Sequence, residues 1–247
     1  ENPKEGGDGT KTVYVGLYGK PGIDIAVYLG QILKNLERKV LIADLTEEKS
    51  LYYLFSVSQK FPVNYGKVDY IGEEFPVYIK ENTHYDIVIL CMKDLVKQPV
   101  GLTVDVCYYI TDTQYANLKA MQCSVRNGHR VSGIIVRDVT EGSINVPYLL
   151  TYVLKDEYLI GLYEKKLVYT IPDDLTDREY RVSMQYGNFG EFRNLSPDFL
   201  EVLKIMAMEI TGDKPGNVKL ALKYAKEGKN IEKHNILEQH FRKKRDK

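Results

Sequence analysis

The fold is decided by residues 13–35, which read VYVGLYGKPGIDIAVYLGQILKN. An apolar strand at 12–17 enters a turn that contains Gly19, Lys20, Pro21 and Gly22. A helix is expected over 22–36, because its apolar residues recur at helical spacing on one side: Ile25, Val27, Leu29, Ile32 and Leu33. A strand, a glycine-bearing turn and an amphipathic helix form the repeating unit of α/β proteins with parallel sheets.

The rest of the chain continues this alternation of strands and helices. Further strands are expected at 39–45, 85–92, 105–111 and 131–138, and short ones at 158–163 and 167–172. Helices are expected at 50–55, 113–127, 144–156 and 196–212, the last with Ser196 as N-cap and Gly212 just past its end. Residues 56–82 are expected to be irregular, with one edge strand. Since the central strands are apolar on both faces, we predict an α/β fold with a doubly wound, mainly parallel sheet flanked by helices.

The composition is that of a globular protein. The 247 residues are 44% hydrophobic and 28% charged, and 34 basic residues balance 34 acidic ones. A net charge of zero gives no reason to expect a nucleic-acid partner. The longest apolar runs, such as 87–92, are too short to span a bilayer, and no signal peptide opens the chain. We expect a cytoplasmic protein, and the start at Glu1 rather than Met indicates a trimmed or excised sequence.

The charge is unevenly distributed along three segments. Residues 1–11 are polar and glycine-rich and are expected to be a tail or an interdomain linker. Residues 12–212 form the α/β domain. Residues 213–247 carry eleven basic and five acidic residues, a net charge of +6, and can form two short basic helices broken at Gly228. This C-terminal segment is either a solvated appendix or a docking arm for an acidic partner or an anionic membrane surface.

The turn at 19–24 invites comparison with a P-loop, in which backbone N–H groups at a helix N-terminus wrap phosphates. A lysine there neutralises phosphate oxygens, and the next Ser or Thr holds Mg²⁺. In this chain Lys20 is followed by Pro21, which has neither a hydroxyl group nor an N–H. If the helix is aligned by its apolar face, Gly22 and Ile23 take the two positions instead. Asp24 then suits the helix dipole but would repel a phosphate.

The whole chain resembles the MinD/ParA family of deviant-Walker P-loop ATPases, including its CpaE/TadZ-like branch of pilus and secretion assembly proteins. The resemblance covers residues 12–212. KVLIADLTEEKSLYYLF at 39–55 is similar to the family's KVLLIDLDPQ segment, and HYDIVILCM at 84–92 to its YDYIIIDTP strand. VDVCYYITDTQYANLKAMQ at 104–122 and VSGIIVRD at 131–138 are similar to two later segments. The order and spacing of all these segments is the specific feature of the match.

The resemblance also says which positions this chain has lost. The family's P-loop lysine and threonine fall on Gly22 and Ile23, or on Lys20 and Pro21, and its signature lysine falls on Leu17 or Tyr18. The positions that keep a vestige of nucleotide binding are Gly19, Lys20, Gly22 and Asp44. The positions that have degenerated, among them the water-positioning acid, the Walker B aspartate and the adenine-reading asparagine, are Pro21, Ile23, Thr46, Cys91 and Arg137.

These losses predict a catalytically degenerate pseudo-ATPase with no catalytic residue and no bound cofactor. Each electrostatic contact of this kind is worth about 3 kcal/mol, so losing several leaves little phosphoryl transfer. The resemblance implies a scaffold or localisation factor that binds protein partners of a membrane-associated apparatus, with a homodimer and weak contact of the tail with an anionic membrane compatible with it. The alternative is a weakly active ATPase with an unorthodox P-loop, which binds ATP or ADP without tight Mg²⁺ through Lys20.

No metal site is expected, because the three cysteines and four histidines are widely spaced. Cys91 and Cys107 lie in apolar strand-like runs and are expected to be buried thiols. The acids that follow the later strands are expected to cap the backbone or stay solvated rather than serve as general acids or bases: Asp112, Asp138, Asp173 and Asp174.

Overall fold

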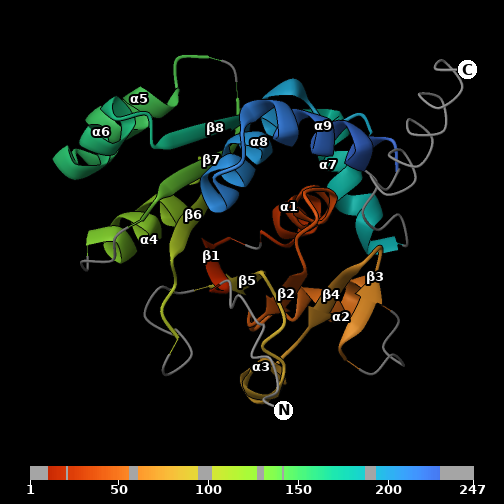
Figure 1. The fold of residues 1–247 in the computed structure, drawn as a ribbon. Coiled ribbons are helices and arrows are strands. Elements are labelled where there is room, and N and C mark those ends of the chain that lie inside the picture. The colour runs from red at the N-terminus through yellow and green to blue at the C-terminus, as the bar shows by residue number, and fades with distance from the viewer. Residues whose placement is uncertain are drawn as a thin grey trace, which may run out of the picture.

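The structure is a computed structural model that describes residues 11–20, 22–55, 61–93, 102–126, 131–140, 142–186 and 193–228. Its centre is an eight-stranded sheet in the order β3-β4-β2-β5-β1-β6-β7-β8. Neighbouring strands run parallel except at the edge, where β3 pairs antiparallel with β4. The predicted doubly wound, mainly parallel α/β fold is therefore confirmed (Figure 1).

The bounds of the elements agree with most of the expected ones. The strands are β1 (Val13–Gly19), β2 (Val40–Asp44), β3 (Val63–Tyr65), β4 (Val68–Ile71), β5 (Ile87–Met92), β6 (Val106–Asp112), β7 (Gly133–Val139) and β8 (Val168–Pro172). The helices are α1 (Ile23–Asn35), α2 (Ser50–Leu54), α3 (Phe75–Glu81), α4 (Tyr115–Arg126), α5 (Val146–Tyr148), α6 (Glu157–Glu164), α7 (Leu175–Ser183), α8 (Pro197–Thr211) and α9 (Pro215–Lys226). A π-helical segment, Leu149–Leu154, continues α5, and a 3-10 turn, Met184–Tyr186, follows α7.

The central strands are buried on both faces, as their continuous apolar runs predict. In β5, Ile87, Ile89 and Cys91 point into one hydrophobic cluster, while Val88, Leu90 and Met92 point into another. This alternation follows from the two-residue period of a strand. The sheet therefore needs a layer of helices on each side.

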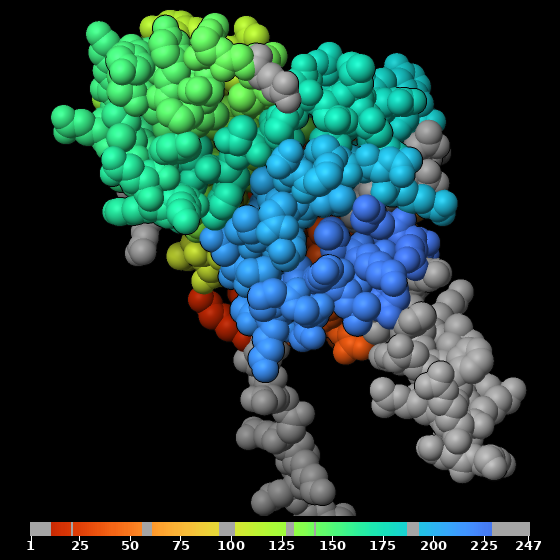
Figure 2. All heavy atoms as spheres, turned by 90° about the horizontal axis from the view of Figure 1, so that it is seen from above, coloured from red at the N-terminus to blue at the C-terminus, as the bar shows by residue number. Residues whose placement is uncertain are grey.

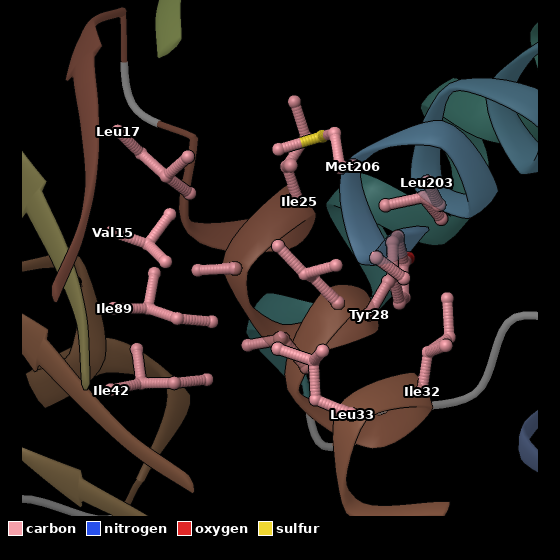
Figure 3. Packing of buried hydrophobic residues seen from close by; sticks show 14 of the residues in the cluster. Val15, Leu17, Ile25, Tyr28, Ile32, Leu33, Ile42, Ile89, Leu203 and Met206 are labelled. Carbon is pink, nitrogen blue, oxygen red and sulfur yellow. The ribbon is translucent and has the colours of Figure 1, made fainter. Parts of the chain in front are cut away.

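One face of the sheet is covered by α1, α8 and α9. Figure 3 shows Ile25, Tyr28 and Leu33 of α1 packed between the strands and Leu203 and Met206 of α8. Helix α8 begins and ends as expected: the Ser196 hydroxyl accepts a hydrogen bond from Phe199 N, and Gly212 takes the left-handed conformation at φ +69°. The apolar face of α1 is therefore buried on two sides, which explains why this helix is almost wholly inaccessible to solvent.

The other face is covered by α3, α4, the π-helical segment and α6. The prediction of a strand at 158–163 is wrong, because these residues lie in α6. Asp156 caps that helix by accepting hydrogen bonds from the backbone N–H of Tyr158 and Leu159. Leu159 and Leu162 then fall on one side and are buried, which is the spacing of a helix.

Residues 61–82 are more regular than expected, since they contain β3, β4 and α3. Only the first of these is the anticipated edge strand. Val68, Tyr70 and Ile71 of β4 are buried, so this strand extends the sheet beyond β2. None of the described helices combines the length and hydropathy that crossing a bilayer requires.

The basic C-terminal segment starts with a helix that is part of the folded body. Val218 and Ala221 of α9 are fully buried and Tyr224 nearly so, and they belong to the cluster around α1 or lie beside it. Figure 2 shows α9 and α8 side by side on one face of the molecule. Arg38 and Asp213 add an ion pair of 3.0 Å between the loop after α1 and the short segment that joins α8 to α9. The second expected helix, after Gly228, lies outside the described residues.

This packing can be tested by a substitution inside α9. Val218→Asp places an unpaired charge at a fully buried position and is expected to lower the free energy of unfolding by about 3 kcal/mol or more. Leu220→Asp, on the same helix at a position 46% exposed, is the matched control and should cost less than about 1 kcal/mol. Urea denaturation of both variants measures the difference. Equal, small effects would show that α9 does not pack on the domain.

Candidate phosphate-binding site

The candidate site lies at the carboxyl end of β1. This strand sits between β5 and β6, and open α/β sheets bind ligands where the strand order diverges in this way. The turn between β1 and α1 is short, because β1 ends at Gly19 and α1 begins at Ile23. Pro21, one of the residues of this turn, lies outside the described residues.

The backbone donors at the start of the turn are already used. Gly19 N donates to the Lys93 carbonyl oxygen at 3.3 Å, and Lys20 N donates to the Ile110 carbonyl oxygen at 3.0 Å. Gly19 has φ +92°, and a Cβ atom there would lie 2.2 Å from the same Ile110 oxygen, so glycine is required. The first N–H groups of the turn therefore hold neighbouring strands and do not face an anion.

A side chain at Gly22, the position aligned with the P-loop lysine, would meet Ile110. A Cβ atom on Gly22 would lie 2.2 Å from the Ile110 Cδ1 atom. Ile23, aligned with the Mg²⁺-binding threonine, is an apolar side chain that packs against the core cluster. In this alignment a lysine at position 22 would require the terminal methyl group of Ile110 to shift.

The N-terminal turn of α1 carries a buried ion pair. Arg137, on β7, donates two hydrogen bonds to the Asp24 carboxylate, at 2.9 Å and 2.7 Å. Asp24 is 2% exposed and Arg137 is 4% exposed, and the guanidinium group also lies 5.7 Å from the ring centroid of Phe199. The N-terminus of a helix attracts anions, and in α1 the Asp24 carboxylate already places a negative charge there. The chain thus supplies that anion itself.

The ion pair keeps both groups charged in spite of their burial. Burial alone would raise the pKa of Asp24, but the Arg137 charge and its hydrogen bonds outweigh it and hold that pKa below its ordinary value. Burial likewise opposes the charge of Arg137, yet the Asp24 carboxylate raises the arginine pKa. The position aligned with the adenine-reading asparagine thus holds a residue whose charge is satisfied inside the protein.

Lys20 is also neutralised by a neighbour. Its ammonium group forms an ion pair with Asp112 at the end of β6. The Asp112 carboxylate accepts further hydrogen bonds from Gln114 N at 2.9 Å and from Asn117 Nδ2 at 2.7 Å, so it holds the turn that leads into α4. Burial would raise the pKa of Asp112, but these hydrogen bonds, with that of Lys20 first, lower it. A phosphate at Lys20 would have to compete with Asp112.

Asp44, which the resemblance suggests is a retained nucleotide-site position, serves as a backbone cap. One of its oxygens accepts from Thr46 N at 3.0 Å and from the Thr46 hydroxyl at 2.6 Å. The other accepts from Leu51 N at 2.9 Å, near the start of α2. Cys91, at the position of the Walker B aspartate, is fully buried, and burial raises its pKa well above the ordinary thiol value. It therefore brings no negative charge to a metal ion.

A cavity of about 560 Å³ remains on the α4 side of β1. Lys20, Lys93 and Asn117 contribute to its wall, together with Glu47 and Glu48. Lys93 Nζ lies 3.3 Å from a Glu48 oxygen, so acids and bases of this wall face each other. Such a wall gives no excess of positive charge for a polyphosphate.

The carboxyl ends of β7 and β8 are also occupied by Arg–Asp pairs. Arg181 donates to Asp138 at 3.2 Å and 3.3 Å, and Arg178 pairs with Asp173. Asp174 caps α7 by accepting hydrogen bonds from Thr176 N and Asp177 N. These acids are thus structural. The sequence analysis missed the arginine partners of Asp138 and Asp173, as it missed the partners of Arg137 and Lys20. In the described part of the chain, no group of three or more His, Cys, Asp or Glu side chains could hold a metal ion.

Comparison with solved structures identifies the fold. The chain is similar to the MinC:MinD cell division protein complex of Aquifex aeolicus, with a TM-score of 0.51 and 13% identity over 82% of this chain and 97% of that one. It is also similar to a putative plasmid partition protein of Borrelia burgdorferi B31 bound to AMPPNP, with a TM-score of 0.53 and 14% identity over 81% and 98%. The chain has a MinD/ParA-type P-loop NTPase fold. No family model and no curated protein matches it.

The buried pair in this MinD/ParA-type fold can be tested by its removal. Arg137→Met strands a buried carboxylate and is expected to lower the free energy of unfolding by about 3–5 kcal/mol. The double variant Asp24→Leu/Arg137→Met removes both charges and should recover to within about 1 kcal/mol of the native protein. Chemical denaturation measures all three proteins. A double variant no more stable than the single one would contradict the pairing.

The same variants predict a pH dependence with a definite sign. In the native protein the pKa of Asp24 is lowered, so the stabilisation holds at neutral pH and fades only as the pH falls below the ordinary Asp value of 3.8. In Arg137→Met, burial without a partner raises that pKa. The deficit of this variant should therefore grow as the pH rises from about 5 to about 8. A deficit independent of pH over this range would show that burial does not raise the Asp24 pKa in the variant, so that this carboxyl stays charged in the folded and the unfolded state alike.

Proposed function

We propose that the protein is a catalytically degenerate MinD/ParA-like pseudo-ATPase that acts as a scaffold or localisation factor for a membrane-associated assembly, of pilus or secretion type. The observation that carries this proposal is the Asp24–Arg137 ion pair in the first turn of α1. A carboxylate held there repels the phosphates that a P-loop must attract.

The contacts around this pair support the absence of turnover. Phosphoryl transfer relies on positioned charges, including a lysine on the phosphates and a metal ion held by a hydroxyl and an acid. Here Lys20 is paired with Asp112, Ile23 has no hydroxyl, and Cys91 is a buried thiol. Each missing contact is worth about 3 kcal/mol, so three together would lower the rate by several orders of magnitude.

Protein partners are the natural role for a fold of this type without catalysis. One of the similar solved structures is itself a complex of two proteins, MinC and MinD. The resemblance of residues 12–212 to the CpaE/TadZ-like branch supports an assembly apparatus at a membrane. A location in the cytoplasm, peripheral to the inner membrane surface, and a homodimer fit this role.

The alternative is an ATP- or ADP-binding protein with an unorthodox loop. The observation that favours it is the cavity of about 560 Å³ beside Lys20 and Lys93, which has the size of a small-molecule site. Binding there would require Lys20 to leave Asp112. The similar partition protein bound to AMPPNP shows nucleotide binding for that protein alone.

Nucleotide titration separates the two functions. Purified protein is expected to give no saturable heat in calorimetry with ATP or ADP, with or without Mg²⁺, and no hydrolysis above the buffer rate. Lys20→Ala should leave both results unchanged. Hydrolysis that disappears in Lys20→Ala, or saturable binding that weakens in it, would refute the pseudo-ATPase and favour the alternative.

The oligomeric state gives a second test. Without a bound nucleotide there is no ligand to bridge two copies, so the sedimentation coefficient should be the same with and without Mg·ATP. Measuring it over a range of protein concentrations separates ordinary dimerisation from a nucleotide effect. A shift on addition of Mg·ATP alone would contradict the proposal.

A further inference from the structure

Helices α8 and α9 enclose a groove of about 530 Å³ on the outer face of the molecule. Its apolar part is formed by Leu200 of α8 and by Leu220 and Leu222 of α9. Three lysines of α9 line it as well: Lys219, Lys223 and Lys226. Figure 2 shows this face, with the two helices next to each other. The groove is distinct from the cavity beside Lys20, since none of the described lining residues is common to both.

One side of α9 is buried and the other is exposed. Val218, Ala221 and Tyr224 recur at helical spacing and are buried against the domain. Lys219, Leu220 and Lys223 lie on the opposite side, and Leu220 remains 46% exposed. Exposure of a large apolar side chain such as Leu220 to water contributes no free energy to the stability of the fold. This outer side is therefore an amphipathic surface without a partner in the described structure.

The charge of the groove is unbalanced. Glu227 contributes the single carboxylate among its lining residues, against the three ammonium groups. In the part of the chain that the structure describes, no ion pair joins Lys219, Lys223 or Lys226 to an acid. Other surface lysines do have such partners, for example Lys204 with Glu201 on α8. The groove therefore carries an excess of positive charge directly beside an apolar surface.

Charge also argues against cover by the chain's own C-terminal segment. Residues 229–247 contain seven basic and three acidic residues, which is a net charge of +4 by sequence. Like charges repel, so this segment is a poor occupant of a lysine-rimmed groove. A flat anionic bilayer is a poor occupant as well, since a concave groove is filled by a convex element such as a helix.

We propose that this groove binds an acidic amphipathic helix of a partner protein. Apolar side chains of that helix, three or four residues apart, would pack on Leu200, Leu220 and Leu222. Glu or Asp side chains that flank them would pair with Lys219, Lys223 and Lys226 and set the orientation of the helix. The inference goes beyond the pseudo-ATPase role, because it concerns a different surface and holds whether or not a nucleotide binds.

A synthetic helix tests the proposal on the full-length chain. The probe is a fluorescein-labelled, capped peptide of about 16 residues, long enough for about four turns, with leucine at helical spacing and glutamate elsewhere. Fluorescence anisotropy should show saturable binding that weakens between about 50 mM and about 300 mM salt. A scrambled peptide of the same composition should bind at least about tenfold more weakly, because its leucines share no face.

Two double variants localise the binding. Lys219→Glu/Lys223→Glu reverses the charge of the groove and should weaken the peptide by about tenfold or more. Lys80→Glu/Lys165→Glu changes the net charge by the same amount at exposed positions on α3 and after α6, and should change the affinity by less than about twofold. Leu220→Asp should weaken binding as well. Circular dichroism melting checks that each variant is folded.

Several results would overturn the proposal. Equal loss of peptide affinity in both double variants would show an effect of net charge alone, and no loss in either would exclude the groove as the binding site.

Binding of phosphatidylglycerol vesicles, but not of the peptide, through Lys219 and Lys223 would make this a membrane-binding face. Displacement of the probe by a peptide of residues 229–247 would show cover by the chain itself. A change of sedimentation in Lys219→Glu/Lys223→Glu would make it an interface between two copies. Absence of ATP turnover affects none of these outcomes, so the two proposals fail separately.

Discussion

The ion pair of Asp24 and Arg137 is the interaction on which the carboxyl edge of the sheet depends. The two residues are 113 positions apart in the sequence, and their contact ties the first turn of α1 to β7 across β6. Removing either charge leaves the other buried and unpaired in a site from which water is excluded. The pair therefore fixes α1 on the sheet and puts a carboxylate where the fold ordinarily attracts a phosphate.

The same principle extends along this edge. Lys20 is paired with Asp112, and Asp44 caps the backbone around Thr46 and Leu51. The acids at the carboxyl ends of β7 and β8 are paired with Arg181 and Arg178. Groups that could recognise a nucleotide are thus used to hold the protein together. The outer face differs, because its lysines on α9 have no acidic partner in the described residues. In our proposal, this molecule binds its partner at a helix surface and not at the sheet edge.

The sequence was sufficient to predict the central strands of the sheet, because the apolar runs of β1, β2 and β5 suit strands that are buried on both faces. It was also sufficient for α8, whose cap residues Ser196 and Gly212 act locally. It was insufficient for residues 158–163, where bulky apolar residues suit a strand as well as a helix until the Asp156 cap is seen. It could not reveal the partner of Asp24, since no local pattern connects a helix turn with an arginine on a distant strand.

The central claim is that the first turn of α1 carries its own anion and binds no phosphate. The most direct measurement is a heteronuclear NMR titration of the isotope-labelled protein with Mg·ATP, following the backbone amide signals of Lys20, Gly22, Ile23 and Asp24. The account predicts that these signals do not move up to millimolar nucleotide. Saturable shifts concentrated on these amides would show that the turn still wraps a phosphate, and would contradict the account.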